Sequence, residues 1–160
     1  PKAVLLQILL WAGNGPCEAA IANLVWLAFF FLLRPGEYVW TNSNPHPFTL
    51  RDVFFKIGTI RYRADQVPLD MLHLVTYVGL NFTEQKNGVK SELIGLSRSR
   101  DTQACPELVL LRRVHHLRAN HAADESPLFV YYNQGEAHRV TDRHDHQTTA
   151  SRRHCGQSTG

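Results

Sequence analysis

The chain has 160 residues, of which 44% are hydrophobic, and this is enough for one globular domain with its own core. Its formal net charge of +3 is mildly basic, so the composition is compatible with a nucleic-acid partner without establishing one. The three cysteines, Cys17, Cys105 and Cys155, are far apart and form no Cys-x-x-Cys pair. This argues against a disulfide framework or a zinc ribbon and favours a reducing compartment.

Two helices are predicted in the first part of the chain. Residues 2–12 are rich in Leu, Ile and Val and indicate a short buried helix. The Gly-Asn-Gly-Pro turn that follows predicts a second helix from about Cys17 to Leu33, because proline is favoured at a helix start. Its apolar run, residues 19–33, is shorter than the ~20 residues that cross a bilayer. We therefore expect a buried core helix, and no membrane as a partner.

The apolar run ends abruptly in Arg34-Pro35-Gly36-Glu37. Pro35 restricts the residue before it away from the helical region, and it suits the first position of a new helix. Glu37 then stands where its carboxylate can reach back to an orphan backbone N–H at the helix start. Two interpretations of Arg34 are open. It is a phosphate-binding arginine, whose planar fork can bind two oxygens, or a surface arginine paired with Glu37.

The middle of the chain predicts a small three-stranded antiparallel sheet. The run from Val53 to Tyr62 is rich in β-branched and aromatic residues, and residues 74–83 and 89–96 form two further strands. Asn87-Gly88 is a strong hairpin signal and places Lys86 at the tightest turn. The predicted class is α+β: a mainly helical domain with this sheet.

A polar loop and a basic helix follow the sheet. Residues 97–102 form the loop, and Pro106 opens the helix. One helix face is apolar, and the other faces predict a basic outer surface; the apolar residues are Leu110, Val114 and Leu117, and the basic ones Arg112, Arg113, His115, His116 and Arg118. Residues 127–132 are apolar and should dock on the core. Residues 133–160 hold four apolar residues among 28, so we expect residues 1–132 to fold and 133–160 to be a disordered tail.

The order of these segments resembles the catalytic domain of the tyrosine recombinase (phage integrase) family over roughly residues 1–140. Leu33–Glu37 resembles the first-arginine motif, and Leu50–Val53 resembles the leucine–aspartate segment that follows it. Phe82–Val89 looks like the β-hairpin that carries the catalytic lysine, most like those of recombinases from eukaryotic mobile elements. Cys105-Pro106 and then Pro127–Phe129 match the later order of segments.

The resemblance implies DNA strand breakage and rejoining in DNA recombination and integration. In the family a tyrosine attacks the phosphodiester, two arginines and a histidine stabilise the transition state, and a lysine protonates the leaving oxygen, without metal or other cofactor. By resemblance Arg34 is the first arginine, Glu37 its supporting acid and Lys86 the general acid, with Lys90 as the alternative lysine. The implied partner is double-stranded DNA, with self-association on it, in an intracellular and, for a eukaryotic host, nuclear setting. The candidate phosphate contacts besides these are Lys90, Arg98, Arg100, Arg112, Arg113 and Arg118.

The second half of the family's site is not found in the expected place. His115-x-x-Arg118 has the form of the second motif, but it precedes Pro127–Phe129, whereas the family's motif follows that segment. We interpret it as a basic helix face that touches DNA backbone or solvent. Tyr131 and Tyr132 follow it too soon to be the nucleophile, and no tyrosine occurs after Tyr132. We therefore expect a C-terminally truncated or frame-shifted domain that does not cleave DNA alone.

Three other interpretations concern the tail and the function. His144, His146, His154 and Cys155 are spaced irregularly, so a solvated histidine-rich tail is favoured over a metal cluster. The chain is alternatively a non-catalytic DNA-binding or partner-binding domain on the same fold. In the third interpretation it is a helical interaction or membrane-associated protein in which the basic residues are incidental.

Overall fold

The structure is a computed structural model that describes residues 14–42, 47–84, 90–102 and 104–141, with the single residues Ala3 and Gln7 in helical conformation. The helix predicted over 2–12 therefore lies almost wholly outside the described residues. Within them the chain is α+β, as predicted. The elements are α2 (Pro16–Phe31), α3 (Pro35–Tyr38), the 3-10 helix η1 (Leu50–Asp52), β1 (Val53–Ile57), β2 (Ile60–Arg63), the 3-10 helix η2 (Leu69–Leu74), β3 (Tyr77–Glu84), β4 (Lys90–Ser97), α4 (Pro106–Ala119), β5 (Val130–Asn133) and β6 (Glu136–Arg139).

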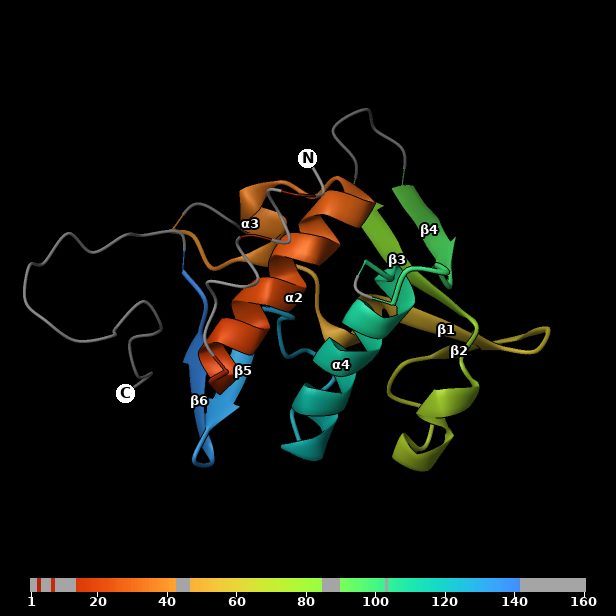
Figure 1. Ribbon diagram of the computed structural model, residues 1–160. Coiled ribbons are helices and arrows are strands. Elements are labelled where there is room, and N and C mark those ends of the chain that lie inside the picture. The colour runs from red at the N-terminus through yellow and green to blue at the C-terminus, as the bar shows by residue number, and fades with distance from the viewer. Residues whose placement is uncertain are drawn as a thin grey trace, which may run out of the picture.

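Helices α2 and α4 lie side by side and carry the centre of the core (Figure 1). On one side α4 contacts β3 and β4 of the main sheet, and on the other both helices contact β5 of the C-terminal hairpin. The core is apolar at the junction of these layers. Its most deeply buried members include Leu24, Leu27, Phe55, Leu80, Leu110 and Leu117.

Helix α2 begins at the proline that the sequence indicated and ends slightly before the predicted residue. Pro16 occupies the first turn, and the last helical residue is Phe31. Leu32 then adopts a left-handed conformation with φ 54°, and the Leu33 N–H donates to the Ala28 carbonyl at 3.0 Å. Such a turn satisfies the last carbonyls of a helix. No helix in the described part of the chain is long and apolar enough to cross a membrane.

The main sheet is antiparallel with strand order β2-β1-β3-β4, one strand more than the three predicted. The run from Val53 to Tyr62 is a hairpin and not a single strand. Ile57 pairs with Ile60, and Gly58 adopts φ 59° in the two-residue turn between them. A positive φ at the first turn position favours glycine and matches the twist of paired strands. Gly58 was therefore the signal that divides this run.

The predicted tail is wrong over its first part, because β5 and β6 form a hairpin. Asn133 pairs with Glu136 across a turn in which Gln134 and Gly135 have φ of 50° and 83°. The hairpin is joined to the rest of the chain, since the Val140 carbonyl accepts a hydrogen bond from the Trp40 N–H at 2.8 Å. Pairing of backbone groups and burial of one face thus compensate for the low apolar content. Residues 142–160 lie outside the described residues.

The cysteines differ from the prediction at one position. Cys105 is a free, buried thiol, whereas Cys17 is disulfide-bonded. Cysteine usage therefore gives no support to the predicted reducing compartment.

Candidate nucleic-acid interface

Arg34 lies at the corner between α2 and α3, where the sequence placed it. Pro35 occupies the first turn of α3, and the Glu37 N–H donates to the Arg34 carbonyl at 2.8 Å. In return the Arg34 backbone N–H donates to Glu37 Oε2 at 2.7 Å, which confirms the predicted contact to an orphan amide. The Glu37 carboxylate is thus bound to the main chain. Arg34 is exposed, and within the described ranges its guanidinium has no ion-pair or hydrogen-bond partner.

The Arg34 corner is attached to the strand that leads into the predicted lysine hairpin. The Phe48 N–H donates to the Glu37 carbonyl at 3.2 Å, and the Phe48 ring meets the Phe82 ring edge-on with centroids 4.8 Å apart. Phe82 lies near the end of β3. Lys86 lies outside the described residues, and so does the side chain of Lys90, the first residue of β4.

The leucine–aspartate segment stabilises the start of η1. Asp52 Oδ2 accepts hydrogen bonds from the Thr49 N–H and the Thr49 hydroxyl, both at 2.9 Å. Leu50 is buried, and its N–H donates to the Ser126 carbonyl at 3.1 Å. This segment therefore has a structural role that needs no ligand.

Arg98 neutralises a buried carboxylate. Its Nε donates to both oxygens of Glu107 at 3.0 Å, and Glu107 is fully buried in the first turn of α4. The hydrogen bonds and the charge of Glu107 raise the pKa of Arg98. Burial of an unpaired carboxylate costs free energy, so the main role of Arg98 is to stabilise the fold by pairing with Glu107. Its side chain is still 55% exposed, but it is a weaker phosphate candidate than the sequence suggested.

The predicted basic surface of α4 is wrong for two of its arginines. Arg113 is 1% exposed, because it shares the buried face of α4 with Leu110 and Leu117, and it donates to the Val130 carbonyl. Burial lowers the pKa of Arg113 to about 10, so the guanidinium stays charged at neutral pH. Arg118 is half-buried and donates to the carbonyls of Ala64, at 2.9 Å, and of Val67. Neither is placed to bind phosphate, whereas Arg112 is exposed.

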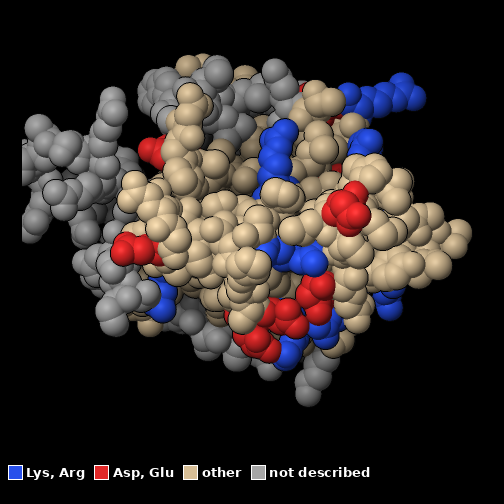
Figure 2. Space-filling view, turned by 90° about the horizontal axis from the view of Figure 1, so that it is seen from below, with Lys and Arg blue, Asp and Glu red and all other residues tan. Residues whose placement is uncertain are grey.

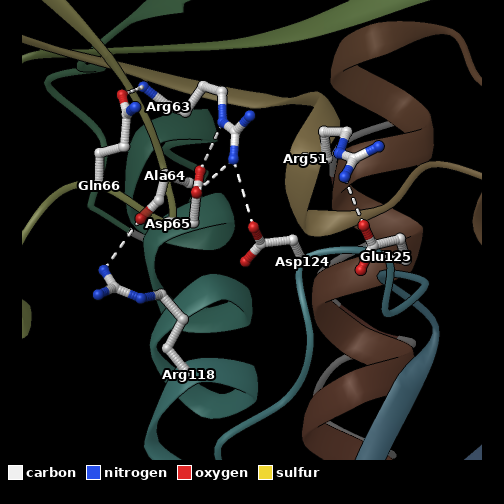
Figure 3. Close-up of polar contacts among 8 residues, drawn as sticks. All are labelled: Arg51, Arg63, Ala64, Asp65, Gln66, Arg118, Asp124 and Glu125. Carbon is white, nitrogen blue, oxygen red and sulfur yellow. Dashed lines mark hydrogen bonds and ion pairs between the residues drawn. The ribbon is translucent and has the colours of Figure 1, made fainter.

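A polar network between η1, β2 and the loop after α4 binds further arginines (Figure 3). Arg63 Nε donates to Asp65 at 2.8 Å, and Arg63 is also 3.3 Å from Asp124, which lies in the loop after α4. Arg51 forms an ion pair with Glu125 in the same loop. The hydrogen bond from Arg63 lowers the pKa of Asp65.

This network joins segments that are far apart in the sequence. It ties the end of β2 and the start of η1 to the loop that follows α4. In the view from below, acidic and basic side chains are interleaved and form no continuous basic patch (Figure 2). The chain's basic residues are therefore not gathered on that face.

His116 and the two tyrosines near it have structural partners. His116 Nε2 accepts a hydrogen bond from the Tyr132 N–H at 2.9 Å. Burial lowers the pKa of His116 to about 4, and the charges of Arg113 and His115 act in the same direction. Tyr131 is 3% exposed and stacks on His138, and burial raises the pKa of its hydroxyl. None of these features suits a nucleophile or a transition-state donor. We interpreted His115-x-x-Arg118 as a basic helix face that touches DNA backbone or solvent, but His116 and Arg118 instead bind backbone groups of this chain.

The phosphate candidates that remain are exposed and unpaired. Within the described ranges the guanidinium groups of Arg34, Arg100 and Arg112 have neither an ion pair nor a hydrogen bond. In the same ranges no three His, Cys, Asp or Glu side chains are grouped closely enough to hold a metal ion. The tail residues His144, His146, His154 and Cys155 lie outside them.

Sequence reasoning missed two features that the structure brings together. Glu107 is buried against Arg98, and a proline-opened helix gives no signal that its acidic second residue turns inward. Trp40 and Arg139 are nearly a hundred residues apart, yet the Arg139 guanidinium lies 5.6 Å from the centre of the Trp40 ring. The lone tryptophan just after the Arg34 corner was the available signal.

No protein-family model, no curated protein and no solved structure matches this chain.

Proposed function

We propose that this chain is a DNA-binding fragment of a tyrosine-recombinase-like catalytic domain, which holds the DNA backbone but does not cleave it alone. One observation carries the proposal. The Arg34 guanidinium is exposed at a corner fixed by Pro35 and Glu37, and the nearby carboxylate is bound to a backbone N–H instead of to the guanidinium.

Several features of this corner suit a phosphate. An arginine fork binds two phosphate oxygens at once, and because the fork is planar and preorganised, less side-chain entropy is lost for each hydrogen bond. Other arginines on the surface, such as Arg51, Arg63 and Arg98, have carboxylate partners that compete with phosphate. Arg34 has none in the described part of the chain. Arg100 and Arg112 are the supporting backbone contacts in this proposal, and Lys86 keeps the general-acid role that the resemblance implies.

The proposal includes no strand cleavage by this chain. The described tyrosines nearest the family's second motif are Tyr131, which is buried, and Tyr132, whose N–H is bonded to His116. No tyrosine follows them in the sequence. The alternative, a non-catalytic DNA-binding domain on the same fold, leads to the same prediction of DNA binding. It differs only in not deriving from a catalytic domain.

Salt-dependent binding of a labelled DNA duplex tests the proposal. We expect affinity to fall steeply between about 50 and 200 mM salt, because phosphate contacts release counterions. Arg34→Ala should weaken binding and reduce the slope of log affinity against log salt by about 1. Arg51→Ala is the matched control, since Arg51 is exposed but paired with Glu125, and it should change the slope little. Binding that ignores salt, or equal effects of the two variants, would contradict the proposal.

A nicked suicide duplex tests the second half of the proposal. We expect no covalent protein–DNA adduct with this chain. An adduct that disappears in Tyr131→Phe or Tyr132→Phe would show that the chain carries its own nucleophile, and the proposed inability to cleave would be wrong.

A further inference from the structure

A pocket of about 240 Å³ opens between the segment after α3 and the C-terminal hairpin. Its described walls come from four parts of the chain: the stretch after the Arg34 corner, the stretch before η1, the segment that leads into β5, and the end of β6. The described residues in its lining include Trp40, Thr41, Pro47, Pro127, Phe129 and Arg139.

Trp40 is fixed through its backbone, and its side chain is half-buried. Its backbone N–H donates to the Val140 carbonyl at 2.8 Å, and Trp40 forms a β-bridge with Thr141. The Arg139 guanidinium lies 5.6 Å from the ring centre. A cation in this position over an indole is attracted to the ring. Both side chains are half-buried and both line the pocket. Together they form a flat, positively charged surface there.

The charge and size of the pocket restrict its ligand. Among the described residues that line the pocket, Arg139 is the only charged one, and none carries a carboxylate. The remaining walls are proline and aromatic rings and the Val130 side chain, and the Thr41 hydroxyl can both donate and accept a hydrogen bond. Pockets for drug-sized molecules start at about 300 Å³, so this one suits a single flat ring system with a nearby negative charge.

We propose that this pocket binds one unpaired nucleotide, with its base stacked on Trp40 and its phosphate bound by Arg139. The proposal rests on the DNA-binding function proposed above and adds an unpaired strand to the substrate. Bases stack on aromatic rings and on guanidinium planes in single-strand binding sites, and stacking tolerates any base sequence. Trp40 follows α3 directly, so the same short segment connects the pocket to Arg34.

The pocket fits a base better than a proline-rich peptide. Grooves for such peptides are lined by aromatic rings that stay open to the ligand. Here Phe129 is only 3% exposed, so among the described lining residues Trp40 is the one aromatic side chain that is not fully buried. One open ring beside one cation matches a single base with its phosphate.

Binding of a short oligothymidylate, followed by tryptophan fluorescence, tests the inference. We expect an oligomer of about eight nucleotides to quench the emission of the intact chain. An abasic oligomer of equal length and charge should bind about tenfold more weakly, because it has no base to stack. In a Trp11→Phe background, which removes the tryptophan outside the described residues, Trp40→Phe should abolish most of the quenching, since Trp26 is only 2% exposed. Arg139→Gln should weaken binding, whereas Arg61→Gln, which removes a similar cation–ring contact with Phe54, should not.

The possible outcomes separate the two proposals. Equal binding of the two oligomers, or binding unchanged in both Trp40→Phe and Arg139→Gln, overturns the nucleotide pocket. If the duplex affinity still depends on Arg34, the proposed function survives that result. The nucleotide pocket would also be overturned if an acidic proline-rich peptide displaced the oligothymidylate and bound more tightly than it does. Thermal unfolding of each variant confirms that the fold is intact, and the wild-type comparison of the two oligomers needs no variant at all.

Discussion

The ring of Tyr77 on β3 lies directly over Gly95 on the edge strand β4. A β-carbon added at Gly95 would stand 2.0 Å from the Tyr77 hydroxyl oxygen and 2.2 Å from the ring. Tyr77 is also the ring over which Lys56 of β1 lies, at 5.3 Å from its centre. The glycine therefore makes room for an aromatic side chain that spans three strands of the sheet.

Gly95→Ala should destabilise the protein by about 1–3 kcal/mol, because the added methyl group forces the ring or the strand to move. In a Tyr77→Ala background the same substitution should cost much less, since the ring is gone. Urea denaturation of the four chains of this cycle measures the coupling. An equal cost in both backgrounds would mean that the close contact is not the reason for glycine.

Glu37→Ala should lower the free energy of unfolding by about 1 kcal/mol, because the Arg34 N–H loses its acceptor at the start of α3. Glu37→Gln should cost less, since an amide oxygen can still accept this bond. Thermal unfolding measures both variants. Glu136→Ala is the control. The Glu136 side chain is 77% exposed, and its carboxylate makes only a long 4.0 Å contact with the His138 ring, so we expect little change in stability. A similar loss in the control would contradict a specific role for Glu37.

Stability should fall as the pH decreases from about 6.5 to about 4. The pKa of His116 is lowered to about 4 in the fold, from 6.5 in the unfolded chain, so the unfolded chain takes up a proton first. The stabilisation is present above 6.5 and is lost through this window. Since the imidazole is only part-buried, we expect a loss of about 1 kcal/mol.

His116→Gln should flatten this pH dependence, because the amide oxygen can still accept the Tyr132 N–H and does not titrate. Denaturant titrations at several pH values measure the slope. Substitution of exposed His73 by Gln is the control and should leave the slope as in the parent chain. A parent slope retained in His116→Gln would assign the acid sensitivity to another group.

The neighbours Arg112 and Arg113 should respond oppositely to substitution. Arg112→Gln should weaken duplex binding and reduce the salt slope by about 1, because Arg112 is exposed. Arg113→Met should leave DNA binding unchanged, because its guanidinium is buried. It should also raise the free energy of unfolding by about 1 kcal/mol, since removal of an unpaired buried charge outweighs the lost bond to the Val130 carbonyl. Duplex titrations and urea denaturation measure the two effects, and a DNA defect in Arg113→Met would contradict this assignment.

The signals that sequence reasoning used correctly were local. Pro16 and Pro106 open their helices, and Glu37 binds the N–H three residues before it. Two hairpin turns were missed although their signals are local too, at Gly58 and Gly135. A single glycine in an apolar run is a weaker hairpin signal than Asn-Gly, and the low apolar content after residue 133 outweighed the second one.

The sequence by itself determined where α2, α3 and α4 begin, because a helix start depends on a proline or a carboxylate within one turn of it. It also contained the spacing that buries Arg113, three residues after Leu110 and four before Leu117. Only the tertiary structure decided which arginines are left for a ligand. The partners of Arg51 and Arg118 come from segments more than fifty residues away, and so does Asp124, the second partner of Arg63 after its neighbour Asp65. Such long-range pairings arise when the sheet packs against the loop after α4 and against α4 itself.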